Sequence, residues 1–134
     1  MLEKRLLQIA VTTGCLVPLV GGALGIWRGP AMVSGAPVGD LDSHFRYLSG
    51  LLLGIGLGYV STIRGIESRG TRFQMLTAIV VIGGLGRLIS LIAVGAPSTS
   101  MTAALVMELA VTPALALWQH RVARRHFGDT SRNN

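Results

Sequence analysis

The sequence predicts an all-α polytopic membrane protein, an antiparallel bundle of four transmembrane helices. Half of its 134 residues are apolar, and they gather in four runs separated by short polar connectors, at about residues 6–27, 45–63, 73–96 and 101–118. A spanning helix needs about 20 mostly apolar residues. Because backbone groups in lipid must find partners within their own segment, runs of this length form helices. They leave almost no room for a soluble domain, so we expect residues 1–134 to form a single membrane domain.

The basic residues gather on one side of the predicted bundle, and the first connector holds only Arg28, with Arg46 at the head of the next helix. The others precede the first run, fill the second connector and follow the last run in a basic tail at 119–134, whereas the third connector has no charge. Segments rich in lysine and arginine stay on the cytoplasmic side, so we expect both termini in the cytoplasm. The net charge of +6 then reflects topology and the anionic inner leaflet. Nucleic-acid binding is not expected, because the tail lacks interleaved aromatic residues.

Cysteine and histidine chemistry is sparse. Cys15 is the one cysteine, which excludes an internal disulfide and a thiol oxidoreductase that works through a cysteine pair. No group of His, Cys and carboxylate residues has the spacing of a metal site. We therefore predict neither a metal nor a cofactor.

The first helix (6–27) is rich in small residues, namely Gly14, Gly21, Gly22, Ala23 and Gly25. Gly21 and Gly25 form a GxxxG pair, and small residues let helix backbones approach closely in lipid. Pro18 lies in the middle of the run, where it is expected to kink the helix or to free a carbonyl. We interpret the glycines as packing positions.

The most informative motif of the second helix (45–63) overlaps its start: Asp42-Ser43-His44-Phe45-Arg46-Tyr47-Leu48-Ser49-Gly50. Ser43 is expected as the N-cap. A four-residue repeat then predicts a ridge with an ion pair at its head and a groove for close packing of a helix or a flat ligand behind it; its members are Asp42, Arg46, Gly50, Gly54 and Gly58. We interpret His44 as an interfacial hydrogen-bonding residue, although its titration range also suits proton transfer. Tyr47 suits the interfacial aromatic belt.

The third and fourth helices each carry one charge near their middle, Arg87 and Glu108. A charge at that depth costs roughly 2.5–3.5 kcal/mol on insertion scales, so each is expected to be paired, to face water or to bind something. At a rise of 1.5 Å per residue, both lie within about 5 Å of the midplane, on its outer side. We predict an ion pair between them, with Asp42 and Arg46 closing the cluster from the outer face. Thr112 is placed to satisfy a carbonyl near Pro113.

The motif at 42–50 resembles that of a bacterial four-helix inner-membrane family known only as a domain of unknown function. The likeness includes Gly86-Arg87 and Met107-Glu108-Leu109 and covers essentially the whole chain. It implies a multi-pass protein of the bacterial inner membrane, and it implies that Arg46, Arg87 and Glu108 are the positions to test. The four-span layout is also distantly similar in shape to DoxX-type membrane proteins.

Four readings of the charged cluster remain open. Arg46 and Arg87 are suited to hold the acidic group of a small or lipidic ligand, with Glu108 orienting Arg87 and the protein acting alone or as an accessory subunit. A lone intramembrane glutamate also suits a proton-coupled transporter, although a nearby Arg87 would hold it ionised. An intramembrane isomerase or lipid-modifying enzyme would use Glu108 or His44 as its acid or base, without a recognisable nucleophile. The pair is also suited simply to dock two helices.

Of these readings we predict ligand binding, with the lipid bilayer as the first partner. The sequence decides neither whether a reaction is catalysed nor whether the glycine ridges build a homodimer or a larger membrane complex, because such ridges serve both intrachain and interchain packing.

Overall fold

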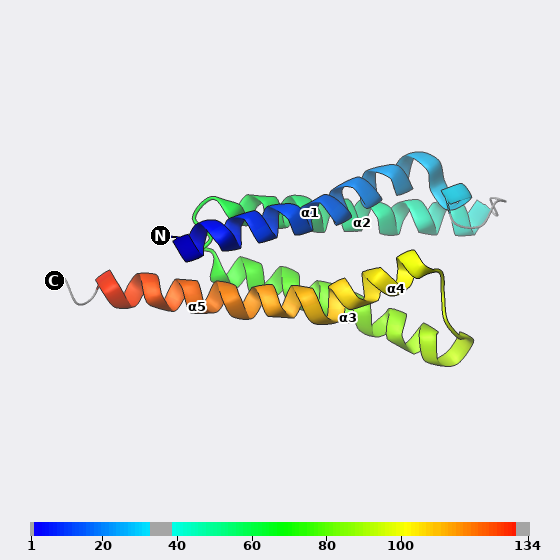
Figure 1. Cartoon of the computed structure of the whole chain (residues 1–134). Helices are drawn as coiled ribbons and strands as arrows, with labels where there is room; N and C mark the ends of the chain where they lie inside the picture. The colour runs from blue at the N-terminus through cyan, green and yellow to red at the C-terminus, as the bar shows by residue number, and fades with distance from the viewer. Residues whose placement is uncertain (1, 33–38, 131–134) are drawn as a thin grey trace. The chain divides into compact units, whose positions relative to one another are not determined.

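The structure is a computed structural model that describes residues 2–32 and 39–130, and these residues are almost entirely helical (Figure 1). The elements in order are α1 (Leu2–Arg28), the 3₁₀ turn η1 (Gly29–Met32), α2 (Gly39–Ile63), α3 (Gly70–Val94), α4 (Thr99–Val106), the π-helical turn η2 (Met107–Val111) and α5 (Thr112–Thr130). Because α4, η2 and α5 follow one another without a gap, they form one continuous helix. The predicted all-α fold with four long helical segments is therefore confirmed.

Three of the helical segments have the length and composition to cross a membrane: α1, α3 and the continuous helix over Thr99–His126. They establish the chain as a membrane protein. α2 is not among these three, because charged residues occupy its first two turns and glycines replace larger apolar residues further along. The crossing of α2 thus remains a prediction.

The chain divides into two compact units. The α1–α2 unit comprises Gln8–Arg64, and the α3–α5 unit comprises Met1–Leu7 with Gly65–Asn134. Each unit pairs two helical segments that run in opposite directions (Figure 1). The short connectors between paired segments favour this antiparallel arrangement.

In the α1–α2 unit the helices touch through small residues. A Cβ atom added at Gly22 of α1 would lie 2.7 Å from the backbone nitrogen of Leu53 and 2.8 Å from the carbonyl oxygen of Ser49. A Cβ atom at Gly56 would lie 3.1 Å from a methyl group of Leu19. The backbones therefore meet at Gly22, which only a glycine permits at this separation.

The start of α2 differs from the prediction. Ser43 was expected as the N-cap, but the helix already begins at Gly39, so that expectation is wrong. Asp40 and Asp42 lie in the first turn, where carboxylates interact favourably with the positive end of the helix dipole. This stabilisation lets the helix begin at Gly39, well before the apolar run that starts at residue 45.

In the α3–α5 unit the core gathers at the end that holds the N-terminus. Leu7, Ile66 and Phe73 are buried there together with Gln119. Gln119 Nε2 donates to the carbonyl oxygen of Ile66 at 2.8 Å, which fixes the connector between α2 and α3 against α5. The residues 119–130 of the predicted basic tail are consequently part of a helix, while the last four residues lie outside the described part of the chain.

The π-helical turn η2 lies directly before Pro113. Proline has no N–H and its ring displaces the preceding turn, and a π turn inside a helix accommodates such a break. The backbone N–H of Thr112 bonds to the carbonyl oxygen of Met107, and the Thr112 hydroxyl donates to the same oxygen at 2.8 Å. Thr112 therefore supports the backbone beside the proline, and the turn that it closes carries Glu108.

Candidate functional site

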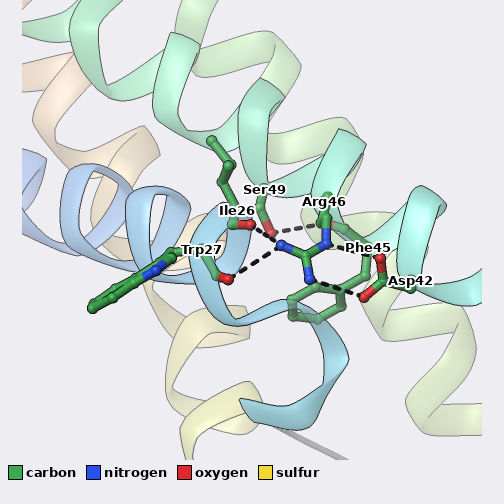
Figure 2. Close-up of polar contacts among 6 residues, drawn as sticks. All are labelled: Ile26, Trp27, Asp42, Phe45, Arg46 and Ser49. Carbon is green, nitrogen blue, oxygen red and sulfur yellow. Dashed lines mark hydrogen bonds and ion pairs between the residues drawn. The ribbon is translucent and has the colours of Figure 1, made fainter. Parts of the chain in front are cut away.

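Arg46 is almost fully engaged within the α1–α2 unit (Figure 2). Its Nε donates to Asp42 Oδ2 at 2.8 Å and its Nη2 donates to Asp42 Oδ1 at 3.2 Å. Its Nη1 donates to the carbonyl oxygen of Trp27 at 3.2 Å and also to that of Ile26. These contacts account for four of the five N–H donors of a guanidinium group. Arg46 thus has little capacity left for a ligand.

The partners of Arg46 explain its role. The last carbonyl groups of a helix have no intrahelical donor, and they carry the negative end of the helix dipole. Ile26 and Trp27 contribute such carbonyls at the end of α1, so the positive guanidinium caps that helix. The chain turns away at Gly29 with a φ of +62°, and a side chain at this position would collide with Asp42 and Arg46.

Ser49 completes the contact with α1. Its hydroxyl donates to the carbonyl oxygen of Phe45 at 2.8 Å (Figure 2), and the residue is buried. A Cβ atom at Gly25 would overlap the Ser49 side chain. The polar residues of the 42–50 motif that face α1 therefore join two helices.

His44 and Tyr47 lie apart from this contact. Both are exposed, and their ring centroids are 6.4 Å apart with a 34° tilt. No hydrogen bond links either side chain to Arg46 among those between described residues. They form a small aromatic pair on another face of α2.

Arg87 and Glu108 meet in the α3–α5 unit. Arg87 Nε donates to Glu108 Oε1 at 3.0 Å, and Arg87 Nη1 points to Met101 Sδ at 3.0 Å. A thioether sulfur is only a weak acceptor. Three of the five guanidinium N–H groups therefore have no partner among the described residues, and 39% of the Arg87 side chain is exposed.

Glu108 is more enclosed than its partner. Its side chain is 16% exposed, and Oε2 is buried without a hydrogen-bond partner within the described part of the chain. A Cβ atom added at Gly84 would lie 3.0 Å from Glu108 Cβ and 2.7 Å from a methyl group of Leu109. Gly84 thus lets η2 approach α3, and the carboxylate reaches Arg87 from there.

The structure brings the predicted site residues together in two separate groups. Asp42 pairs with Arg46 in one unit, and Arg87 pairs with Glu108 in the other. One cluster of all four residues remains a prediction. Sequence reasoning missed Met101 and the α1 carbonyls, because neither type of group has a recognisable sequence signal.

The predicted packing glycines differ in their surroundings. Gly25 is in close contact with Ser49, whereas Cβ atoms at Gly21 and Gly50 would meet only side-chain methyl groups, at 3.9 and 4.0 Å. A Cβ atom at Gly54 would have no neighbour within 4 Å, and Gly58 is half-buried. The contact with the α2 backbone is at Gly22, one residue after Gly21 and therefore about 100° further around the helix.

No three His, Cys, Asp or Glu residues of the described ranges lie together in a way that would hold a metal ion. The chain was compared with known proteins and families. No curated protein and no solved structure matches it. A family model described as "Domain of unknown function (DUF4345)" matches residues 6–119, from the start of the first apolar run to the buried Gln119. Since the match covers most of the chain, this protein belongs to the DUF4345 family.

Proposed function

We propose that this membrane protein binds the acidic group of a small or lipidic ligand at Arg87, with Glu108 as the residue that orients the guanidinium. The observation that carries the proposal is that three N–H groups of Arg87 have no partner among residues 2–32 and 39–130. An arginine within a span is retained when it binds or pairs with something, and one carboxylate oxygen with one thioether does not fill its capacity. A carboxylate or a phosphate would accept two parallel bonds from the remaining donors.

The comparison with Arg46 supports this choice. Both arginines are half-buried and both are paired with a carboxylate. Arg46 donates two further hydrogen bonds to carbonyl oxygens of α1, whereas beyond Glu108 the one further partner of Arg87 among the described residues is the sulfur of Met101. We therefore assign Arg46 and Asp42 a structural part in joining α1 to α2, and the ligand site to Arg87.

The π-helical turn at Glu108 also supports a functional site, because such turns inside helices occur frequently at functional positions. The proposal includes a location in the bacterial inner membrane with both termini in the cytoplasm, which follows from the distribution of basic residues. A reporter that fluoresces only in the cytoplasm, fused to the C-terminus, tests this orientation, and a dark fusion would contradict it.

A purely structural ion pair is the competing explanation, and the close contact at Gly84 favours it. Glu108 Cβ lies where a Cβ atom of residue 84 would be 3.0 Å away, so the pair could serve only to align η2 with α3. Loss of one partner of a buried pair destabilises a soluble protein by about 3–5 kcal/mol. A variant that loses function by unfolding would then resemble one that loses a ligand.

Native mass spectrometry separates these explanations. We would extract the wild-type protein gently from its own membrane beside the variants Arg87→Gln and Arg28→Gln, the second of which removes an exposed charge with no described partner. We expect an additional bound mass in the wild type and in Arg28→Gln, and its absence from an Arg87→Gln variant that keeps its helical circular dichroism. A wild-type protein without bound mass, or a bound mass retained in Arg87→Gln, would contradict the proposal.

The exchanged double variant Arg87→Glu with Glu108→Arg provides a second test. A structural pair should be restored by the exchange, so folding and ligand retention should both recover. A ligand that needs an arginine on α3 should stay absent although the protein folds. If the bound ligand is converted on incubation, the protein is an enzyme: a product of different mass indicates a lipid-modifying enzyme, and an isomer of the same mass, separated by chromatography, indicates an isomerase.

A further inference from the structure

The end of the α3–α5 unit that holds the N-terminus carries a concentrated positive charge. We call the following seven residues the basic end: Lys4, Arg5, Arg69, Arg72, Arg121, Arg124 and Arg125. They come from the start of α1, the start of α3 and the second half of α5. All belong to one compact unit, so their arrangement is set by the packing of that unit.

The acidic side chains described at this end are already neutralised within the protein. Glu67 pairs with Lys4 at 2.7 Å. Glu3 pairs with Arg125 and lies 3.8 Å from Arg121. Two carboxylates are therefore shared among three of the basic residues.

Arg5, Arg69 and Arg124 remain exposed without such a partner. Each is exposed, and no ion pair or hydrogen bond joins their side chains to another described residue. Because α5 continues as a helix to Thr130, Arg124 is held on a rigid element and not on a loose tail. Burial of Gln119 and Val122 fixes which face of α5 packs inward.

Their position along the helices matches the depth of lipid phosphates. Trp118 ends the last apolar run, at the level where interfacial aromatic residues lie. Arg124 follows six residues later, about 9 Å along the axis, so its backbone lies just beyond a headgroup layer of about 5–8 Å and within reach of the phosphates for a long side chain. Arg5 directly precedes the first apolar run, and Arg69 directly precedes α3. Long arginine side chains bend toward such a boundary.

We propose that Arg5, Arg69 and Arg124 bind the phosphate groups of anionic phospholipids, so that the protein collects these lipids around one end of the α3–α5 unit. Guanidinium groups recognise phosphate through paired N–H donors. The negative leaflet supplies the counter-charge that the protein lacks here. This site is separate from Arg87 and does not depend on the function proposed for it.

Spin-labelled lipids test this proposal directly. The full chain is reconstituted in phosphatidylcholine vesicles that contain a trace of spin-labelled phosphatidylglycerol or spin-labelled phosphatidylcholine. Electron paramagnetic resonance then gives the fraction of each lipid that is motionally restricted at the protein. We expect wild-type protein to favour phosphatidylglycerol, by up to about fivefold for each arginine that engages a phosphate. Salt at about 0.5 M should remove most of this preference.

The variants make the assignment specific. The triple variant Arg5→Gln, Arg69→Gln and Arg124→Gln should bring the preference close to one, while the matching triple lysine variant should retain a large part of it. Arg28→Gln, which removes an exposed charge at the other end of α1, should leave the preference unchanged. Three outcomes would each overturn the proposal. Wild type could restrict both lipids equally, its preference for phosphatidylglycerol could be insensitive to salt, or the triple glutamine variant could keep that preference. If the triple glutamine variant does not fold, the test uses wild type and the triple lysine variant. A preference for phosphatidylglycerol that salt removes in both proteins supports the proposal, and one that salt does not remove overturns it.

Discussion

The contact between α1 and α2 makes a sharp prediction for two neighbouring glycines. A Cβ atom at Gly22 would lie 2.9 Å from the Leu53 Cα atom, which is about 0.6–1.1 Å inside the optimal distance between carbon atoms. The atoms that it meets belong to the backbone, so no side chain can rotate away. A Cβ atom at Gly21 would meet only a methyl group of Leu52, at the ordinary distance of 3.9 Å. Gly22→Ala should therefore force the helices apart, and Gly21→Ala should not.

The magnitudes follow from two opposing effects. Overpacking typically costs about 1–3 kcal/mol, whereas alanine is better than glycine inside a helix by about 0.5–1 kcal/mol. We expect Gly22→Ala to lower the free energy of unfolding by roughly 0.5–2 kcal/mol, and Gly21→Ala to raise it by up to about 1 kcal/mol.

Reversible unfolding in mixed micelles of sodium dodecyl sulfate and a nonionic detergent measures this difference. Far-ultraviolet circular dichroism follows the transition of the full chain, and the two variants are compared with wild type in the same mixture. If Gly22→Ala is as stable as Gly21→Ala, the helices do not meet at Gly22. A destabilised Gly21→Ala beside a normal Gly22→Ala would instead place the contact on the GxxxG face that the sequence suggests.

Three further predictions use the same unfolding assay. Arg46→Gln should lower stability more than Arg28→Gln, because among the described side chains it is Arg46 that donates to the last carbonyls of α1. Thr112→Val should lower it by about 0.5–1.5 kcal/mol, since the hydroxyl bond across the π-helical turn is lost. Burial alone raises the pKa of Glu67, but the hydrogen bond from Lys4, the Glu67 backbone and nearby positive charges lower it below its ordinary value. Its contribution to stability should therefore be complete above about pH 4.3 and be lost as the pH falls through the lowered pKa.

Each of these predictions has an outcome that would contradict it. Equal stability of the two glutamine variants would show that Arg46 does not join the helices. A Thr112→Val variant with unchanged stability and unchanged helicity would show that the hydroxyl is not needed beside the proline. For Glu67 the control is Glu67→Gln, which should lose the part of the acid response that wild type shows. An identical response to acid in both proteins would exclude Glu67 as the group that titrates.

The helices could be predicted from the sequence because lipid leaves apolar runs of this length one conformation. The ends of the helices were harder to predict, because α2 begins before its apolar run, where Asp40 and Asp42 stabilise the first turn. The π-helical turn before Pro113 could not be predicted from the sequence either. A proline indicates that the hydrogen-bond ladder is interrupted, but a kink, a water or an extra residue in the turn can each absorb the interruption.

Which face of α1 packs against α2 could not be predicted from the sequence, for a different reason. Gly21 and Gly22 are adjacent in sequence and differ by about 100° around the helix, and which of them faces α2 depends on how both helices rotate to bury their other side chains. The GxxxG pattern marks Gly21 and Gly25, yet the backbone of α2 lies against Gly22, while Gly25 contacts the Ser49 side chain. A motif therefore indicates that a close contact exists without specifying which neighbouring glycine makes it.

The two arginines show what determines function at such positions. On the sequence Arg46 and Arg87 are equivalent, each a charge in or at the edge of an apolar run with a carboxylate available. They differ in the groups that surround them: two helix-end carbonyls lie beside Arg46, and a thioether lies beside Arg87. A guanidinium whose N–H donors are all paired holds helices together, and one with unpaired N–H donors in a low dielectric is stabilised by binding an acid.

If this reasoning holds, Met101→Gln should weaken ligand retention while leaving the fold stable. The glutamine supplies a strong acceptor in place of the sulfur and competes with the ligand for Arg87. Unchanged retention in Met101→Gln would mean that the open donors of Arg87 do not form the site.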